Sequence, residues 1–332
     1  MAPSEKVGIV SIGEMGVGVA KLLVAHGYTV LTNITGRSEY TQRRATTASI
    51  VLLGSDEDLV SQADYLLSIV PPRDALATAE RFAGVKTSGR IKPLYYLDLN
   101  ATSPKLARKT AEIFRQNAPG VKYVDGGIIG GPPRVVEEQD CTQSATPTDI
   151  GVGWARPSIP LSGPHELPNE HLAKVLNVTH VGPEVGSASG LKCCFGSIIK
   201  GLIAISIQSF STAEALGVYG ELQRHLEMFQ PALQKSTTRM VTEIPPKAGR
   251  WVDEMWEIGR CFGEDGGWDN VTGDEGADVY KRIAEVYRTI ADDTVLGKER
   301  PEHRVRGKTA DDVAVAIVDA LKGGKGAKPK DH

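Results

Sequence analysis

Residues 6–38 read KVGIVSIGEMGVGVAKLLVAHGYTVLTNITGRS, and the rest of the chain is organised around this stretch. A short apolar run begins close to the N-terminus, breaks at small residues and continues into a helical period that ends at Gly27. A second apolar run follows at once. This layout predicts a strand, a tight turn, a helix and a second strand, which together form one βαβ unit.

The turn carries an imperfect dinucleotide-binding fingerprint. Gly13 and Gly16 match the second and third glycines of G-x-G-x-x-G, and Ser11 occupies the first position. The pyrophosphate of a dinucleotide sits at the N-terminus of the helix that follows, where free N–H groups and the helix dipole favour negative charge. The pattern alone is weak evidence. A strand before it and a helix after it favour cofactor binding over a chance glycine turn.

The tip of the second strand discriminates between the two nicotinamide cofactors. An acidic side chain there would bond the ribose 2′-hydroxyl, and a basic one would accept a 2′-phosphate. No acid occurs from Asn33 to Ser38, whereas Arg37 and Ser38 lie at the tip. Arg43 and Arg44 follow, and a solvated helix face explains them equally well. The sequence therefore predicts NADP(H) rather than NAD(H).

Composition narrows the class of protein. The 332 residues suffice for two domains with cores of their own. A net charge of −3 and a pI near 6.2 predict neither nucleic acid nor a membrane as partner. The four cysteines follow no metal-ligand spacing, so no metal is expected, and they indicate a reduced, cytoplasmic setting. No signal peptide is recognisable, and no apolar run is expected to reach the length of a membrane helix.

Strands and helices alternate through the first half of the chain. Further apolar runs predict strands at residues 50–53, 65–70, 95–99 and 121–124. Ser103 is the expected N-cap of a helix that follows one of these strands. The alternation predicts an α/β, doubly wound Rossmann domain with a mostly parallel sheet whose carboxyl ends carry the ligand. The loops at Gly13, Pro71 and Asn100 should share that edge.

The end of the first half is less regular. Residues 134–156 are polar and without period, which predicts a long inserted loop. A strand over residues 159–161 should follow, after which Ser162-Gly163-Pro164 leads into a helix that ends at Leu176, and a last strand is expected over residues 178–181.

The second half lacks any strand pattern, so an all-α C-terminal domain is expected. Residues 186–216 predict one long interdomain helix. Residues 250–262 predict another, with Met255 on its buried side and Glu254 and Glu257 facing away. We predict an NADP-binding Rossmann domain over 1–183, a helical substrate and dimerisation domain over 184–321, and a disordered tail over 322–332.

Lys192 is the candidate for proton transfer. A nicotinamide cofactor supplies the hydride, so the protein has to hold the substrate and move one proton. Small residues precede Lys192 and apolar ones follow it, a setting that lets a ligand approach and disfavours a charged amine by desolvation. A lysine that extends to solvent from an interdomain helix is the alternative, and spacing leaves both open.

Several motifs occur in an order that resembles the β-hydroxyacid dehydrogenase superfamily, which includes 3-hydroxyisobutyrate and 6-phosphogluconate dehydrogenases and the imine reductases. The motifs are SIGEMG at 11–16, the Pro71-Pro72 turn, DLNATSP at 98–104, DGGIIGG at 125–131 and the segment around Lys192. The resemblance extends to about Leu216. Residues 250–258 resemble the helical C-terminal domain of a phosphogluconate-dehydrogenase-like branch.

The resemblance implies roles for particular residues. A lysine at the position of Lys192 acts as general base in oxidation and general acid in reduction. Substrate binding is implied for Asn100, Gly130, Gly131, Ser189 and Gly196, the glycine pair acting through backbone N–H groups. The fingerprint and the resemblance together assign the cofactor to Ile12, Gly13, Glu14, Met15, Gly16, Thr35, Arg37, Ser38, Val70, Pro71, Pro72 and Asn100. A homodimer is implied, with long helices packed together and the active site between domains.

Three positions depart from the family pattern. Ser11 replaces the first fingerprint glycine, Ile129 replaces a substrate-loop serine, and Gly196 replaces an asparagine four residues after the lysine. The last two changes remove hydrogen-bond donors that would orient a small hydroxy acid. Gly196 should also open space one helical turn from Lys192. We therefore expect a bulkier, less acidic substrate than hydroxyisobutyrate or phosphogluconate.

The leading hypothesis is an NADP(H)-dependent oxidoreductase that acts on a small-molecule hydroxy acid or its carbonyl partner, with Lys192 as general acid/base. The alternative is an imine reductase that uses NADPH. The loss of carboxylate-binding groups favours this alternative, and the retained lysine disfavours it. A cofactor-binding regulator without turnover is the third hypothesis, because a fold does not guarantee activity.

Overall fold

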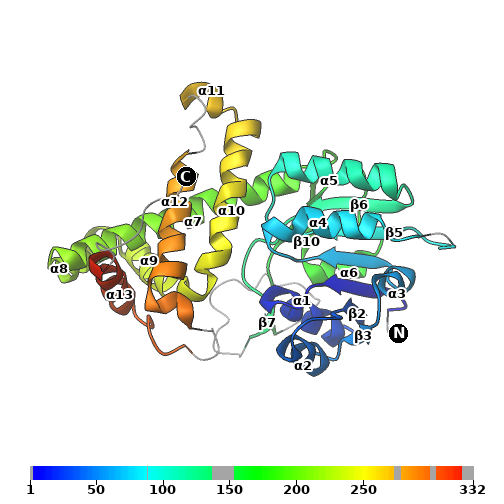
Figure 1. The fold of residues 1–332 in the computed structure, drawn as a ribbon, viewed down its shortest axis with the longest axis horizontal. Coiled ribbons are helices and arrows are strands. Elements are labelled where there is room, and N and C mark those ends of the chain that lie inside the picture. The colour runs from blue at the N-terminus through cyan, green and yellow to red at the C-terminus, as the bar shows by residue number, and fades with distance from the viewer. Residues whose placement is uncertain (1–2, 88, 137–152, 273–277, 300–303, 324–332) are drawn as a thin grey trace. The chain divides into compact units, whose positions relative to one another are not determined.

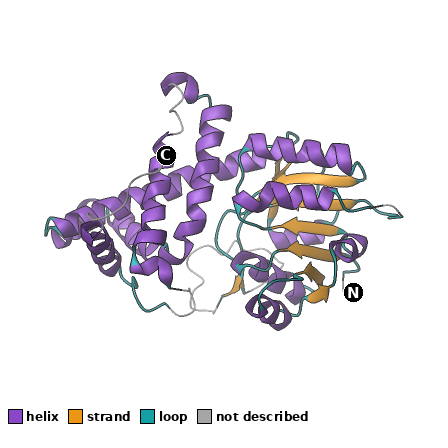
Figure 2. Cartoon of the chain, in the orientation of Figure 1, coloured by secondary structure: helices purple, strands orange, loops and turns teal. Residues whose placement is uncertain are grey.

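The computed structural model describes residues 3–87, 89–136, 153–272, 278–299 and 304–323 (Figures 1 and 2). The chain divides into two compact units, Met1–Cys193 and Cys194–His332. The first unit is a sheet covered by helices, and the described part of the second is helical. The division lies inside one long helix, whereas the sequence placed it at 183/184. The shift arises because the first turns of that helix bind to the sheet, as shown below.

The first unit contains an eight-stranded sheet in the order β10-β9-β6-β5-β4-β1-β2-β3. The strands are β1 Lys6–Val10, β2 Thr29–Asn33, β3 Val51–Leu53, β4 Tyr65–Ser68, β5 Leu94–Asp98, β6 Val121–Gly126, β9 Ile159–Ser162 and β10 Val178–Gly182. Neighbours pair in parallel except β6 and β9, which are antiparallel. The predicted doubly wound, mostly parallel sheet is confirmed.

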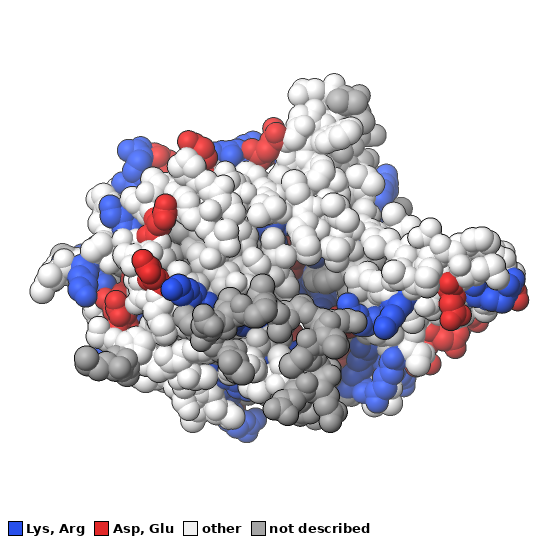
Figure 3. Space-filling model, turned by 180° about the vertical axis from the view of Figure 1, so that it is seen from behind, with Lys and Arg blue, Asp and Glu red and all other residues white. Residues whose placement is uncertain are grey.

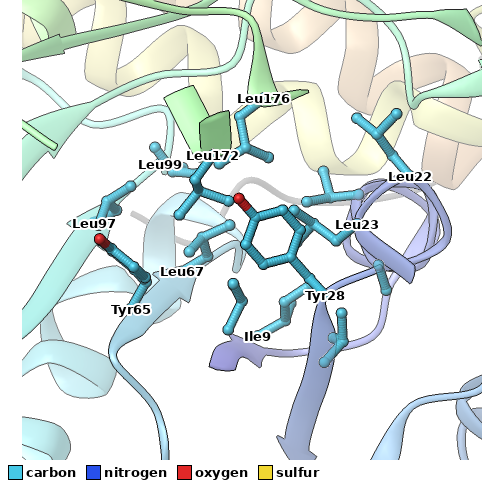
Figure 4. Packing of buried hydrophobic residues seen from close by; sticks show 14 of the residues in the cluster. Ile9, Leu22, Leu23, Tyr28, Tyr65, Leu67, Leu97, Leu99, Leu172 and Leu176 are labelled. Carbon is cyan, nitrogen blue, oxygen red and sulfur yellow. The ribbon is translucent and has the colours of Figure 1, made fainter. Parts of the chain in front are cut away.

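Helices cover both faces of this sheet. They are α1 Glu14–Ala25, α2 Glu39–Thr47, α3 Asp56–Gln62, α4 Pro72–Ala83, α5 Pro104–Asn117 and α6 Glu170–Leu176. Buried side chains of α1, α2 and α6 pack on one face, and those of α3, α4 and α5 pack on the other. Figure 4 shows the Tyr28 ring among Ile9, Leu23 and Leu172 in the first of these cores. Burial on both faces explains why the strands read as continuous apolar runs.

Two sequence predictions in the first unit need correction. The helix expected directly after Pro164 begins only at Glu170, where Asn169 caps it by accepting from the Leu172 N–H at 2.8 Å. Pro168 disfavours helical backbone at the residue before it, which accounts for the late start. The predicted loop over 134–156 is paired at its ends, as β7 Arg134–Val135 and β8 Trp154–Ala155. Residues 137–152, including Cys141, lie outside the described residues.

The second unit begins within α7, Ser187–Ala215, which confirms the predicted long helix. The longer helices after it are α8 Tyr219–Phe229, α9 Pro231–Thr242, α10 Ala248–Arg260, α12 Asp278–Arg288 and α13 Ala310–Gly323. Shorter helical segments are η2 Pro245–Lys247, η3 Cys261–Asp265, α11 Asp269–Thr272, η4 Thr289–Asp293 and η5 Val295–Lys298. The first two residues of the predicted tail, 322 and 323, belong to the end of α13. The rest of the tail lies outside the described residues.

The two glutamates of α10 are buried, contrary to the prediction that they face away. Glu254 pairs with Lys200 of α7 and also accepts from Arg250 Nε at 3.2 Å, while Glu257 pairs with Arg260. Lys200 Nζ also lies 5.2 Å from the centre of the Trp251 ring. Buried carboxylates require such partners, and a helical period cannot reveal them.

The α7 helix is apolar enough, by length and composition, to cross a membrane, so the expectation that no run approaches that length is wrong. Its most apolar 18-residue window has a mean hydropathy of 1.6, and 44% of that window is buried. This is weak evidence for a membrane, because the core helix of a soluble protein has the same properties. On the face drawn in Figure 3, acidic and basic side chains both occur.

Candidate active site

The turn between β1 and α1 keeps a glycine-like backbone although its first residue is a serine. Ser11 has φ +75°, in the left-handed region that only glycine adopts freely. A Cβ on Gly16 would lie 2.3 Å from the Ser11 carbonyl oxygen, so only glycine fits there. A Cβ on Gly13 would meet nothing within 4 Å. The α1 N-terminus is therefore open at Gly13, which suits a pyrophosphate bound by backbone N–H groups.

The tip of β2 is held by hydrogen bonds within the loop. Asn33 Oδ1 accepts from Thr35 N at 3.0 Å and from Thr35 Oγ1 at 2.7 Å, and Asn33 Nδ2 donates to Asp56 Oδ1 at 2.8 Å. Ser38 is the N-cap of α2. Arg37 is exposed at the same tip. The predicted cofactor residues of this loop thus lie together at the carboxyl edge of the sheet.

Arg43 and Arg44 have different surroundings. Arg44 Nη1 donates to the Ile12 carbonyl at 3.3 Å, and its guanidinium lies 4.5 Å from the centre of the Tyr40 ring. The Arg43 side chain forms an exposed ion pair with Glu39 at 4.0 Å. Arg44 therefore lies beside the fingerprint turn, and Arg43 belongs to a solvated helix face.

Asn100 joins two strand ends to the loop that follows β4. Its Nδ2 donates to Ser68 Oγ at 3.0 Å and to Asp98 Oδ1 at 2.6 Å, and its Oδ1 accepts from Val70 N at 2.7 Å. Its side chain is buried. These bonds occupy both amide hydrogens and the carbonyl oxygen. Asn100 therefore holds the Val70 loop, with Pro71 and Pro72 at the start of α4, and the ligand contact assigned to it from the sequence stays a prediction.

Asp98 and Asp125 are buried side by side at the carboxyl ends of β5 and β6. Burial first, and the charge of Asp125 second, raise the pKa of Asp98 to about 7, while hydrogen bonds from Asn100 and Tyr123 oppose the rise. Burial also raises the pKa of Asp125, although several hydrogen bonds counteract it. Two adjacent carboxylates in a low dielectric rarely both ionise, so this pair favours holding a proton.

Asp125 binds the first turn of α7. Its Oδ2 accepts from Ser162 Oγ at 2.7 Å, from Gly186 N at 2.9 Å and from Ser189 N at 3.2 Å, and its Oδ1 accepts from Ser189 Oγ. Ser162 Oγ in turn accepts from Ala188 N at 3.0 Å. Ser189 is completely buried. The structure thus gives Ser189 a place in this network, because its hydroxyl is bound to Asp125, and its substrate contact stays a prediction.

Lys192 lies one turn further along α7, against the loop after β6. A Cβ on Gly127 would come 3.1 Å from Lys192 Cβ and 3.3 Å from Lys192 Cγ, so the lysine stem packs directly on this glycine. Lys192 Nζ donates to the Ile128 carbonyl. The side chain is half-buried. This arrangement favours a held amine over a lysine that extends into solvent.

Gly130 and Gly131 continue the same loop. Gly130 has φ +124°, and a Cβ there would come 3.2 Å from Pro157 Cα, whereas a Cβ on Gly131 would meet nothing within 4 Å. Pro132 and Pro133 pack on Gly18 of α1, at 3.1 Å from an added Cβ. An isolated β-bridge pairs Ile129 with Ser158. The glycine pair is therefore held between this bridge and α1.

Gly196 does not open the space that was expected. A Cβ there would lie 3.1 Å from Ile258 Cδ1 and 3.7 Å from Lys200 Nζ, and Gly196 is buried. The missing side chain is thus replaced by Ile258 of α10, which packs against α7 in the second unit. The part of the substrate argument that depended on open space at Gly196 is wrong.

Sequence reasoning overlooked three of the residues that shape this region. Asp125 and Gly127 stand in a motif that was recognised, but their contacts with α7 come from elements far apart in the chain. Ser162 gave no signal, because its antiparallel pairing with Asp125 follows from sheet topology. Only the absence of a side chain at Gly127 indicated a close approach.

Two family models match separate parts of the chain. The NAD binding domain of 6-phosphogluconate dehydrogenase matches residues 6–140. A domain of unknown function, DUF1932, matches residues 213–290. An uncharacterised 28.5 kDa protein in the 7S RNA 5′ region of Methanothermus fervidus is 26% identical over 222 residues, which are 67% of this chain and 76% of that protein.

Two solved structures are similar in fold. The 3-hydroxyisobutyrate dehydrogenase of Mycobacterium tuberculosis with L-serine has 16% identity and a TM-score of 0.59, over 87% of this chain and 99% of that one. The imine reductase from Myxococcus stipitatus in complex with NADP⁺ has 19% identity and a TM-score of 0.50, over 94% and 99%. At these identities the likeness establishes the fold alone.

Proposed function

Since this chain belongs to the β-hydroxyacid dehydrogenase superfamily, we propose that it is an NADP(H)-dependent oxidoreductase acting on a hydroxy acid or its carbonyl partner. The observation that carries the proposal is the position of Lys192. Its stem packs on Gly127, its amine binds the Ile128 carbonyl, and the open backbone of Gly131 follows in the same loop.

The residues of the first unit fit a nicotinamide dinucleotide. The open α1 N-terminus at Gly13 would hold the pyrophosphate, and the loop from Val70 to Pro72 would lie along the same sheet edge. Arg37, with Thr35 and Ser38, would bind the 2′-phosphate, and Arg44 would add positive charge beside Ile12. A bound nicotinamide supplies or accepts the hydride.

Lys192 would handle the proton. In reduction Nζ would exchange its bond with the Ile128 carbonyl for one with the substrate oxygen and donate a proton to it, and in oxidation it would remove that proton. Gly130 and Gly131 would bind substrate oxygens through their N–H groups. Such a positioned acid contributes about 10²–10⁴-fold to the rate.

The first experiment measures NADPH oxidation over a panel of 2- and 3-keto acids and aldehydes, followed by Lys192→Met and Lys192→Arg. We expect kcat to fall by about 10²–10⁴-fold in Lys192→Met with the Kd for NADPH unchanged. The exposed Lys109→Ala on α5 is the matched control and should behave as wild type. Equal rates in Lys192→Met and wild type would remove the lysine from the mechanism.

Imine reduction is the second candidate, favoured by one specific observation. Ile129 stands where the family pattern expects a serine, so its side chain cannot donate a hydrogen bond to a substrate carboxylate. Cyclic imines tested beside keto acids distinguish the two activities. Tight NADPH binding without turnover on either panel would instead support a cofactor-binding regulator.

We also propose that two copies of the chain associate through α7. Exposed apolar side chains recur along this helix at heptad-like spacing, namely Leu191, Phe195, Ile198 and Ile205, with exposed fractions of 44, 44, 70 and 59%. Light scattering should give the mass of a dimer. Ile198→Glu should shift it toward the monomer, whereas Lys109→Ala should not.

A further inference from the structure

Asp125 and Lys192 belong to one closed chain of contacts within the first unit. From Asp125 the backbone runs through Gly127 and Ile128, both of which contact Lys192. From Lys192 the α7 helix runs back by one turn to Ser189, which donates both its N–H and its hydroxyl to Asp125. Asp125 therefore lies in the strand that leads into the loop that Lys192 contacts, and it also binds the helix that carries Lys192.

Asp125 also supplies hydrogen-bond acceptors for N–H groups at the start of α7. The first N–H groups of a helix have no partner within it. Asp125 accepts those of Gly186 and Ser189, and Ser162 accepts that of Ala188. A negative charge at a helix N-terminus is further stabilised by the helix dipole. Gly186 permits the close approach, since a Cβ there would come 3.0 Å from Pro104 Cβ.

We propose that Asp125 is the positioning residue for Lys192, setting the rotation and height of the first turns of α7 so that the amine stays over the loop after β6. Asp125 reaches Lys192 through Ser189 on one side and through the backbone to Gly127 on the other. The expected effect on kcat rests on the proposed function. The expected effect on the position of the Lys192 amine rests on geometry alone.

Asp125→Asn tests the proposal while preserving volume. An NH₂ group in the place of Oδ2 would face the N–H donors of Gly186 and Ser189, and one in the place of Oδ1 would require the Ser189 hydroxyl to change from donor to acceptor. Ser189→Ala is a milder variant that removes one bond and leaves the backbone bonds in place. Asp319→Asn, an exposed carboxylate on α13, is the matched control.

Two readouts separate positioning from stability. Competitive acetylation followed by mass spectrometry measures the reactivity of the Lys192 amine in the full-length protein without any substrate. We expect Asp125→Asn to change the acetylation rate of Lys192 at least about threefold while that of the exposed Lys109 stays constant. Steady-state kinetics should show kcat reduced by up to about 100-fold, with the Kd for NADPH unchanged. Ser189→Ala should change the acetylation rate of Lys192 and kcat in the same direction as Asp125→Asn, but by a smaller factor.

Unchanged Lys192 acetylation in Asp125→Asn and in Ser189→Ala, together with a lowered Tm, would overturn the proposal and leave Asp125 a purely structural group. If Asp125→Asn does not fold, the Ser189→Ala result decides the question by the same acetylation criterion. A protein that turns over no substrate would overturn the proposed function, and the acetylation rates would still test the positioning role.

Discussion

Asp98 and Asp125 occupy paired positions on the adjacent parallel strands β5 and β6, and both carboxyl groups are buried. Each serves a different part of the site. Asp98 contacts Asn100, which holds the Val70 loop, and Asp125 holds the start of α7. The loop expected to carry the cofactor and the helix that carries Lys192 are therefore joined through two neighbouring acids.

This pair predicts a pH-dependent stability. The pKa of Asp98 is raised to about 7 in the folded protein, and burial raises that of Asp125 as well. A carboxyl group whose folded pKa lies above its unfolded value stabilises the protein below the unfolded value, and this contribution is lost as pH rises to the folded value. The free energy of unfolding should therefore decrease between about pH 4 and pH 7, on the order of a few kcal/mol.

Urea unfolding at pH 5 and pH 8 checks this expectation, with Asp98→Asn as the variant. Asn cannot titrate, so the difference between the two pH values should be smaller in Asp98→Asn than in wild type. Asp319→Asn should keep the wild-type difference. An equal difference in all three proteins would contradict the assignment.

Ser11 predicts a backbone effect in the fingerprint turn. Its φ of +75° costs a non-glycine residue about 1–2 kcal/mol, and a β-branched residue pays more. Ser11→Gly relieves this strain but also increases the conformational entropy of the unfolded chain. The free energy of unfolding should therefore rise by only about 0 to 1 kcal/mol. Ser11→Val should destabilise by about 2 kcal/mol or more.

Chemical denaturation measures both variants. Ser49, whose φ is +57°, lies outside the site and provides a matched pair, Ser49→Gly and Ser49→Val. NADPH titration should show Ser11→Gly binding at least as well as wild type. Stable, cofactor-binding Ser11→Val would show that the turn tolerates another conformation.

The arginines near the tip of β2 predict a selective loss of NADPH affinity. Arg37→Ala and Arg44→Ala each remove a cation beside the proposed 2′-phosphate position, so the Kd for NADPH should rise by about tenfold, or about 1.4 kcal/mol. The Kd for NADH should change less. Arg43→Ala is the control on the same helix and should leave both unchanged, since Arg43 pairs with Glu39 in solvent.

Fluorescence titration of all three variants with both cofactors gives the comparison. The assignment to NADP(H) would be wrong if wild type bound NADH more tightly than NADPH. If Arg44→Ala lost the same affinity for NADH as for NADPH, the function of Arg44 would be to support the turn through its bond to Ile12, and not to bind the 2′-phosphate.

The buried pair of Lys200 and Glu254 predicts a large stability effect in the second unit. Glu254→Leu leaves the buried Lys200 without this carboxylate and should destabilise by about 3–5 kcal/mol, whereas Lys200→Met leaves Glu254 its ion pair with Arg250 and should cost less. The double variant should recover most of the loss seen in Glu254→Leu, because the buried ammonium is then removed as well. The exposed pair of Arg224 and Glu221 should cost less than about 1 kcal/mol in the same experiment.

A double-mutant cycle from denaturant unfolding gives the coupling energy of the buried pair. A double variant as unstable as the sum of its single variants would show that Lys200 and Glu254 contribute independently.

Local sequence patterns were enough to predict the secondary-structure elements and their order. Apolar runs of strand length, the glycines of the first turn and the period of residues 186–216 each depend on neighbouring residues only, and β1, α1, β2 and α7 formed where these local signals placed them. The motif order also located Lys192 and the glycine pair. Local sterics and hydrophobic periodicity are properties of the chain before it folds.

How those elements pack against one another emerged from the folded chain. The antiparallel pairing of β6 and β9 brought Ser162 to Asp125, and the packing of α10 on α7 filled the space beside Gly196 and buried Glu254. The tertiary structure also distinguished Arg44 from Arg43 and joined Ser189 to Asp125. Contacts of this kind join residues distant in sequence, so their partners, and the burial that creates their charge effects, do not exist until the chain is folded.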